Sequence, residues 1–124
     1  MPSNFKPKDP TNPYADYTVE QMYEFLSGYT LTRDIGSRYE YSNLGFGLLG
    51  YVLGRAAGSS YPDLLQKRVL TPLGLTSSWL DVPRSEEARY SHGHYIDGDT
   101  LKRARYWRFN VLAGAGALVM SARD

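Results

Sequence analysis

The fold of this chain is decided by one stretch, Tyr39-Glu40-Tyr41-Ser42-Asn43-Leu44-Gly45-Phe46-Gly47-Leu48-Leu49-Gly50-Tyr51-Val52-Leu53-Gly54. It joins a polar tip to a long apolar segment that is interrupted at intervals by glycine. Ser42 or Asn43 can cap a helix start through its side-chain oxygen. Apolar residues then recur on one face at helical spacing, at Leu44, Leu48, Leu49, Val52 and Ala56. Gly58 suits the position just after the last helical residue, so the stretch predicts a helix that ends before it.

Four glycines lie inside this predicted helix, at positions 45, 47, 50 and 54. Each would destabilise an exposed helix by about 1 kcal/mol relative to alanine. Their presence therefore indicates that neighbouring backbone segments press closely against the helix. We expect this helix to be central in the fold.

Composition narrows the class of protein. A length of 124 residues suits one domain with a real core, and a net charge of +1 does not favour nucleic acid or an anionic membrane as partner. Cysteine is absent, which excludes disulfides and thiol chemistry. No apolar run reaches the roughly 18 residues of a membrane span. The segment Met1 to Lys6 lacks the apolar centre of a signal peptide, so any export signal would lie on sequence outside this chain.

The first half of the chain holds further helix signals around the central stretch. Residues 1–17 carry four prolines and predict an extended arm or a surface loop. Thr18 and Gln21 fit a capping box, which opens a helix that Gly28 ends. A third helix is expected from residue 60 to about residue 70, where Pro72 stops it.

The second half is less regular. Residues 83–88 predict one or two helical turns, and residues 90–99, which are rich in Gly, Asp and Ser, predict a loop. A loop of small residues is expected over 113–118. Residues 121–124 have the form of a helix cap with its first turn, and the sequence stops there. Because one turn is far below the ~12 residues that an isolated helix needs, we expect a chain truncated at this end, and at its beginning as well.

The run Tyr39 to Gly45, the Gly50-Tyr51-Val52-Leu53 segment, Ser60-Tyr61 and the turn Leu70 to Leu75 together resemble the serine β-lactamase and penicillin-binding-protein superfamily. The class C β-lactamase branch, with its related esterases and D-aminopeptidases, is the most similar. The resemblance covers nearly the whole chain. It implies a mainly α structure, a single subdomain over residues 1–124 that corresponds to part of the family's helical domain, with loops and little strand.

The resemblance also implies acyl transfer through a serine ester, with no cofactor. In the family a serine, helped by a lysine one helical turn later, attacks a β-lactam, ester or peptide carbonyl, and backbone amides hold the oxyanion. Tyr41 matches the tyrosine that assists proton transfer, and Asn43 matches the asparagine that orients the lysine and the substrate amide. Ser42, Gly114 and Gly116 match positions that border the substrate.

Two of the family's three site elements have no match here. The Ser-x-x-Lys nucleophile belongs far upstream of the tyrosine, and the Lys/His-Thr/Ser-Gly strand belongs near the C-terminus of a full enzyme. Ser3-Asn4-Phe5-Lys6 satisfies Ser-x-x-Lys literally. Pro7 removes Lys6 from helical geometry and no apolar helix follows, so we interpret the match as accidental.

Each candidate residue also has a simpler interpretation. Tyr41 is one of eleven tyrosines and Asn43 could serve only as a helix cap. A phenol is a poor base at neutral pH unless nearby cations stabilise its anion. His92 and His94 could ligate zinc from a strand, but no cysteine or further histidine supplies a third ligand, so we expect no metal. Residues 102–108 mix cations with aromatics, as nucleic-acid grooves do, yet a solvated surface strand explains them more simply.

The sequence thus predicts a fragment of a serine hydrolase that carries only the Tyr-x-Asn motif and is inactive alone. The alternative is a non-catalytic folded or oligomerising module built on the same scaffold. In either case we expect self-association or a complementing chain, because faces toward absent parts of the fold would stay apolar. A small-molecule acyl substrate is expected only once missing segments complete the site. A full-length relative would be periplasmic or secreted.

Overall fold

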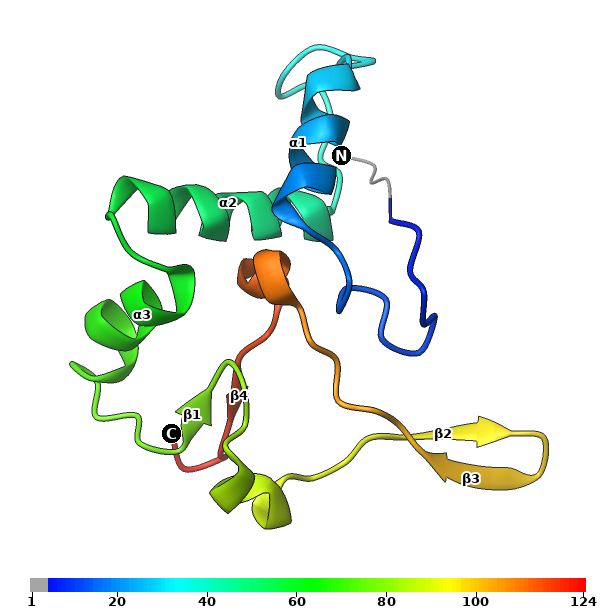
Figure 1. Cartoon of the computed structure of the whole chain (residues 1–124), viewed down its shortest axis with the longest axis vertical. Coiled ribbons are helices and arrows are strands. Elements are labelled where there is room, and N and C mark those ends of the chain that lie inside the picture. Colours follow the sequence, from blue (N-terminus) through cyan, green and yellow to red (C-terminus); the bar gives the residue numbers. More distant parts are fainter. Residues whose placement is uncertain (1–4) are drawn as a thin grey trace.

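The computed structural model describes residues 5–124, and the literal Ser-x-x-Lys candidate Ser3 lies outside them. Of the described residues, 38% are helical and 10% lie in strands, so this part of the chain is mainly α. The α-helices gather on one side and a β-hairpin extends away from them (Figure 1). None of the helices within residues 5–124 combines the length and the apolar character needed to cross a bilayer.

Helix α1 spans Val19–Gly28 and begins as predicted. The Thr18 hydroxyl accepts from the Gln21 backbone N at 3.3 Å, and the Gln21 side-chain oxygen accepts from the Thr18 backbone N at 2.9 Å. These two bonds form a capping box, which satisfies two amides that a helix start would otherwise leave without partners. Met22 is the fully buried residue of this helix.

Helix α2 spans Asn43–Ala56 and confirms the prediction from the opening stretch. Ser42 is the cap residue, since its hydroxyl accepts from the Gly45 backbone N at 3.0 Å. Gly58, with φ at +63°, turns the chain after the helix. The expected close approach of neighbouring backbone is also present: a Cβ built on Gly47 would lie 2.9 Å from the Leu112 Cα.

The neighbour that approaches α2 is η3, a 3-10 segment at Asn110–Ala115. It lies directly under α2 (Figure 1), and this pair makes the most extensive contact between elements of the fold. The prediction of a small-residue loop over 113–118 was therefore wrong for its first part, because η3 continues to Ala115. The core forms around this contact and comprises Tyr14, Tyr17, Met22, Leu44 and Leu112.

The third predicted helix divides into two parts. Helix α3 spans Tyr61–Leu65, with Ser60 as its cap, and a π-helical segment, η1, continues over Gln66–Leu70. The helix thus ends where predicted, but its second half winds more widely than an α-helix. Gly74, with φ at +69°, then forms the expected turn.

The prediction of a loop over residues 90–99 was wrong for residues 94–97, which form a strand. Strand β2, His94–Asp97, pairs antiparallel with β3, Thr100–Arg103, so that Asp97 faces Thr100. Gly98, with φ at +60°, takes the first position of the two-residue connection, where a type II′ turn requires a positive φ. All eight strand residues are exposed, so no apolar alternation marks the hairpin in the sequence.

Two further short elements complete the second half. The segment η2, a 3-10 helix at Arg84–Arg89, matches the helical turns expected near residues 83–88. Strand β1, Ser78–Trp79, pairs antiparallel with β4, Val119–Met120. Beyond β4 the Ser121 hydroxyl accepts from the Asp124 backbone N at 3.2 Å, which is the bond of a helix cap.

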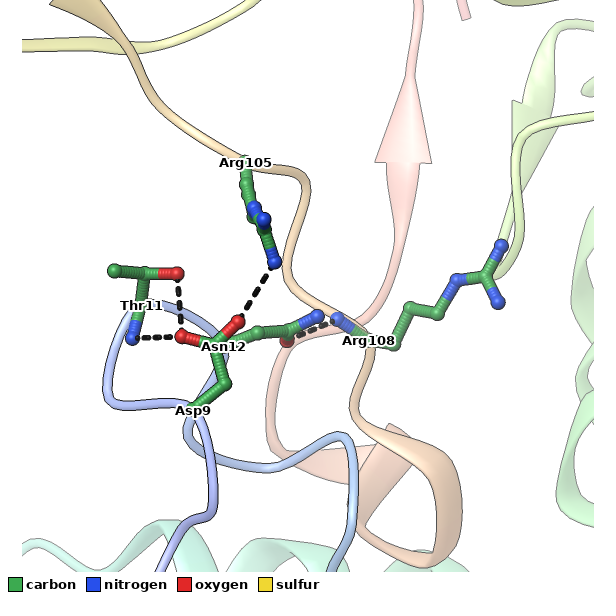
Figure 2. Close-up of polar contacts among 5 residues, drawn as sticks. All are labelled: Asp9, Thr11, Asn12, Arg105 and Arg108. Carbon is green, nitrogen blue, oxygen red and sulfur yellow. Dashed lines mark hydrogen bonds and ion pairs between the residues drawn. The ribbon is translucent and has the colours of Figure 1, made fainter.

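The segment 5–17 folds back onto the body of the molecule. The Asp9 carboxylate accepts from both the backbone N and the hydroxyl of Thr11, at 2.9 and 2.7 Å, and from Arg105 at 2.8 Å (Figure 2). The Asn12 side-chain oxygen accepts from the Arg108 backbone N at 2.9 Å. Figure 2 shows both contacts joining the 9–12 turn to the segment between β3 and η3.

Candidate functional site

The predicted pair Tyr41 and Asn43 lies at the start of α2. Ser42 occupies the cap position and Asn43 is the first helical residue. The Tyr41 hydroxyl donates to the Asn43 Oδ1 at 2.7 Å, so the structure brings the two side chains into direct contact. The Ser42 cap fixes where the helix starts. The helix start in turn fixes the backbone position from which the Asn43 side chain extends.

Tyr41 faces solvent, whereas Asn43 is half-buried. The Tyr41 side chain is 62% exposed and its ring lies beside that of Phe46, with centroids 6.2 Å apart. Behind it, the Asn43 Nδ2 donates to the hydroxyl of Tyr14 at 2.7 Å. The arrangement is a short chain of hydrogen bonds that runs from the surface to a buried tyrosine, and its outer end is exposed to solvent.

Gly114 and Gly116 lie on a different part of the same helix contact. A Cβ built on Gly114 would lie 2.7 Å from the Phe46 carbonyl oxygen, so α2 accounts for the absence of a side chain there. Gly116 adopts φ +144° and ψ 25°, a conformation that favours glycine. The near neighbours of Gly114 are Phe46 and Gly50, and that of Gly116 is Phe109. A substrate-binding role for Ser42, Gly114 and Gly116 stays a prediction.

A titratable cluster that the sequence reasoning missed joins α1 to α2. The hydroxyls of Tyr23 and Tyr51 lie 3.0 Å apart, and Arg55 donates to Tyr51 at 3.5 Å. The hydrogen bond with Tyr23, followed by that from Arg55, lowers the pKa of the Tyr51 phenol. The same Tyr51 contact raises the pKa of Tyr23. The spacing of Tyr51 and Arg55, four residues apart on one helix, was the available signal.

The two histidines have other neighbours. His92 Nε2 contacts the Arg103 guanidinium, and its ring meets that of Tyr90 at 4.6 Å. Burial, and then the positive charge of Arg103, lowers the pKa of His92. His94 opens strand β2. Within residues 5–124 no group of three or more His, Asp or Glu side chains is placed to hold a metal ion.

Three cations of the segment 102–108 are paired with acidic side chains of the same chain. Lys102 bonds Asp97 at 2.5 Å, Arg105 bonds Asp9 at 2.8 Å, and Arg108 lies 3.8 Å from Asp81. Strand β3 supplies the exposed strand character expected here, but it ends at Arg103. These charges are thus directed toward acidic groups of the same molecule.

Comparison with known proteins decides the family. The family model described as Beta-lactamase matches residues 1–124. The chain belongs to the beta-lactamase family. The resemblance to the serine β-lactamase and penicillin-binding-protein superfamily is therefore confirmed.

Individual relatives of this beta-lactamase-family chain agree. A beta-lactamase of Providencia stuartii is 31% identical over 77 residues, which are 62% of this chain and 20% of the relative. The D-alanyl-D-alanine-carboxypeptidase/endopeptidase AmpH of Escherichia coli (strain K12) is 40% identical over 58 residues, 47% of this chain and 15% of the relative. The crystal structure of a class C beta lactamase from Rhodobacter sphaeroides superimposes with a TM-score of 0.72 at 32% identity, over 86% of this chain and 29% of that one.

These relatives place the chain among the serine hydrolases. The chain matches only about a fifth of the Providencia stuartii relative's length. The activity of such a whole protein is therefore a separate question from family membership.

Proposed function

We propose that this chain contributes Tyr41 and Asn43 to the acyl-transfer site of a β-lactamase-type serine hydrolase. The serine, the lysine and the third motif come from another segment or another chain. The observation that carries the proposal is the 2.7 Å bond from the Tyr41 hydroxyl to Asn43 Oδ1 at an exposed helix start. A tyrosine that served only to cap a helix would need neither that partner nor that exposure.

The chemistry is acyl transfer to a serine hydroxyl. The serine oxygen attacks the carbonyl carbon, the serine proton passes to a base, and the leaving nitrogen or oxygen receives a proton as its bond to carbon breaks. Tyr41 assists these proton transfers. Asn43 orients the lysine and the amide of the substrate, which is a β-lactam, a D-amino-acid peptide or an ester. Ser42, Gly114 and Gly116 border the acyl group, and no cofactor takes part.

The outer face of α2 supports a completing partner. Four large apolar side chains on this helix are each between 46% and 53% exposed, namely Phe46, Leu49, Val52 and Leu53. Soluble monomers rarely leave such a continuous apolar surface open. We define these four residues as the α2 outer face, and we infer that a complementing segment or a second copy of the chain covers it.

A second candidate function is a non-catalytic folded or oligomerising module. It is favoured by the sequence of residues 5–124, which contains no Ser-x-x-Lys pair. It is favoured also by Gly114, whose packing against α2 already explains the residue without a substrate. On this alternative the α2 outer face serves assembly only.

A hybrid protein separates the two functions. In the class C beta lactamase of Rhodobacter sphaeroides, the segment that superimposes on this chain is replaced by residues 1–124. Turnover of a chromogenic cephalosporin and of a p-nitrophenyl ester is then measured. The first proposal expects turnover that Tyr41→Phe lowers by about 10²- to 10⁴-fold, the usual contribution of a general acid or base.

The control is Tyr39→Phe, because Tyr39 is 85% exposed and precedes Tyr41 by two residues. This variant should retain the turnover of the parent hybrid. A folded hybrid without turnover would favour the non-catalytic module. Equal turnover in the Tyr41→Phe hybrid and its parent would remove Tyr41 from the mechanism.

A further inference from the structure

Tyr14 is a buried residue that the family resemblance did not single out. Its side chain is only 8% exposed and its ring stacks on Phe109, with centroids 4.9 Å apart and planes 14° from parallel. The rings of Phe5 and Trp107 meet it edge-on at 5.3 and 5.7 Å. Aromatic contacts on several sides therefore hold the ring, and with it the hydroxyl, in one place.

The hydroxyl of Tyr14 points at the candidate site. It accepts a hydrogen bond from Asn43 Nδ2 at 2.7 Å, while Asn43 Oδ1 accepts from Tyr41 at 2.7 Å. The two ends of an amide differ chemically, because the oxygen only accepts and the nitrogen only donates. Whichever end is bound by Tyr14, the opposite end faces Tyr41.

We infer that Tyr14 is a positioning residue, which holds the Asn43 side-chain amide in place and thereby keeps it in hydrogen-bond contact with Tyr41. The inference rests on the proposed function for its importance in catalysis. Its geometry stands on the two hydrogen bonds alone. Tyr14 acts through Asn43 and touches no reacting atom.

A purely structural role for the Tyr14 ring predicts a different result for the Tyr14→Phe variant. If the ring alone mattered, phenylalanine would fill the same space among Phe5, Trp107 and Phe109. With the hydroxyl removed, however, the half-buried Asn43 nitrogen loses its acceptor, and an unpaired buried donor is unfavourable. The amide is then free to rotate, and its contact with Tyr41 is no longer held in place.

The test is nuclear magnetic resonance on the full chain, with the side-chain amide of Asn43 labelled with nitrogen-15. Tyr14→Phe should accelerate hydrogen exchange of that amide about fivefold, which corresponds to one hydrogen bond of about 1 kcal/mol. It should also shift the ring resonances of Tyr41. The matched control is Tyr106→Phe, because the Tyr106 hydroxyl donates to the Leu80 carbonyl at 2.7 Å, away from Asn43. This control should leave both signals unchanged.

A second variant, Asn43→Ala, tests the same hydrogen bond if Tyr14→Phe does not fold. In Asn43→Ala the ring carbon that bears the Tyr14 hydroxyl should shift, because its hydrogen-bond donor is gone. Unchanged exchange of the Asn43 amide in folded Tyr14→Phe, or an unchanged Tyr14 carbon in Asn43→Ala, would overturn the inference. Failure of the proposed function appears elsewhere, as turnover of the hybrid that does not depend on Tyr41.

Discussion

Gly114 of η3 lies directly against Gly50 of α2: a Cβ built on Gly114 would lie 3.0 Å from the Gly50 Cα. The Phe46 carbonyl oxygen would be closer still, at 2.7 Å. Both obstacles are backbone atoms, which cannot rotate aside as a side chain can. The contact between the two elements is therefore set by the main chain itself.

Gly114→Ala should accordingly destabilise the fold by about 1–3 kcal/mol, the usual range for overpacking. Urea denaturation measures this change in the free energy of unfolding. Gly28→Ala is the control, since a Cβ at Gly28 would meet nothing within 4 Å. It should leave stability unchanged or raise it by up to about 1 kcal/mol. Equal stability of Gly114→Ala and the parent chain would contradict the close packing.

Thr18→Ala should weaken the start of α1. The substitution removes the acceptor of the Gln21 backbone N and half of the capping box, a loss of about 0.5–2 kcal/mol. Thermal unfolding followed by circular dichroism reports the change. Thr32→Ala, in an exposed loop, is the comparison and should have little effect. If the two variants melt alike, the capping box does not stabilise the helix.

Acidification should lower stability through His92. Burial and the Arg103 charge hold its pKa below the ordinary value of 6.5 in the folded chain. His92 therefore binds a proton at a higher pH in the unfolded chain than in the folded chain. Acidification thus favours the unfolded state. This stabilising contribution is complete above pH 6.5 and is lost as pH falls through the lower folded pKa.

The measurement is the free energy of unfolding as a function of pH, above and below pH 6.5. His92→Gln should reduce the pH dependence in this window, and His94→Gln, which keeps the His92 contact, should retain it. A pH dependence that survives His92→Gln in full would assign the effect to other groups.

The α2 outer face should make the isolated chain self-associate. Replacing Leu49 and Leu53 together by lysine places two charges on this surface and should shift the association to higher protein concentration, as sedimentation velocity would show. Ile35→Lys is the control, because Ile35 is 91% exposed and lies outside the face. A parent chain that stays monomeric at all accessible concentrations would show that no second copy covers the α2 outer face in the isolated protein.

Local signals in the sequence were sufficient for α1 and α2, but not for η3. Ser42 caps α2, Gly58 turns the chain after it and Thr18 forms a box with Gln21, all through contacts between near neighbours. The β2–β3 hairpin was missed because its strands have no buried face and thus no alternating pattern. The Gly98-Asp99 pair between Ile96 and Leu101 was the remaining clue.

The candidate site was only partly predictable. The contact between Tyr41 and Asn43 follows from residues two apart, next to a helix cap. The bond between Asn43 and Tyr14 joins residues 29 positions apart, and no local rule relates them. It arises because Tyr14 packs on Phe109, which brings the N-terminal segment onto the start of η3. Tertiary packing of this kind is visible only in three dimensions.

The glycine–glycine contact between α2 and η3 allows two properties of the molecule to change separately. One is the geometry of the polar pair Tyr41 and Asn43, and the other is the surface that α2 offers to a partner. Because bare main chain sets the distance between these elements, the side chains on the opposite side of α2 can be exchanged without tilting the helix that carries Asn43. The surface offered to a partner can therefore diversify while the polar pair keeps its geometry.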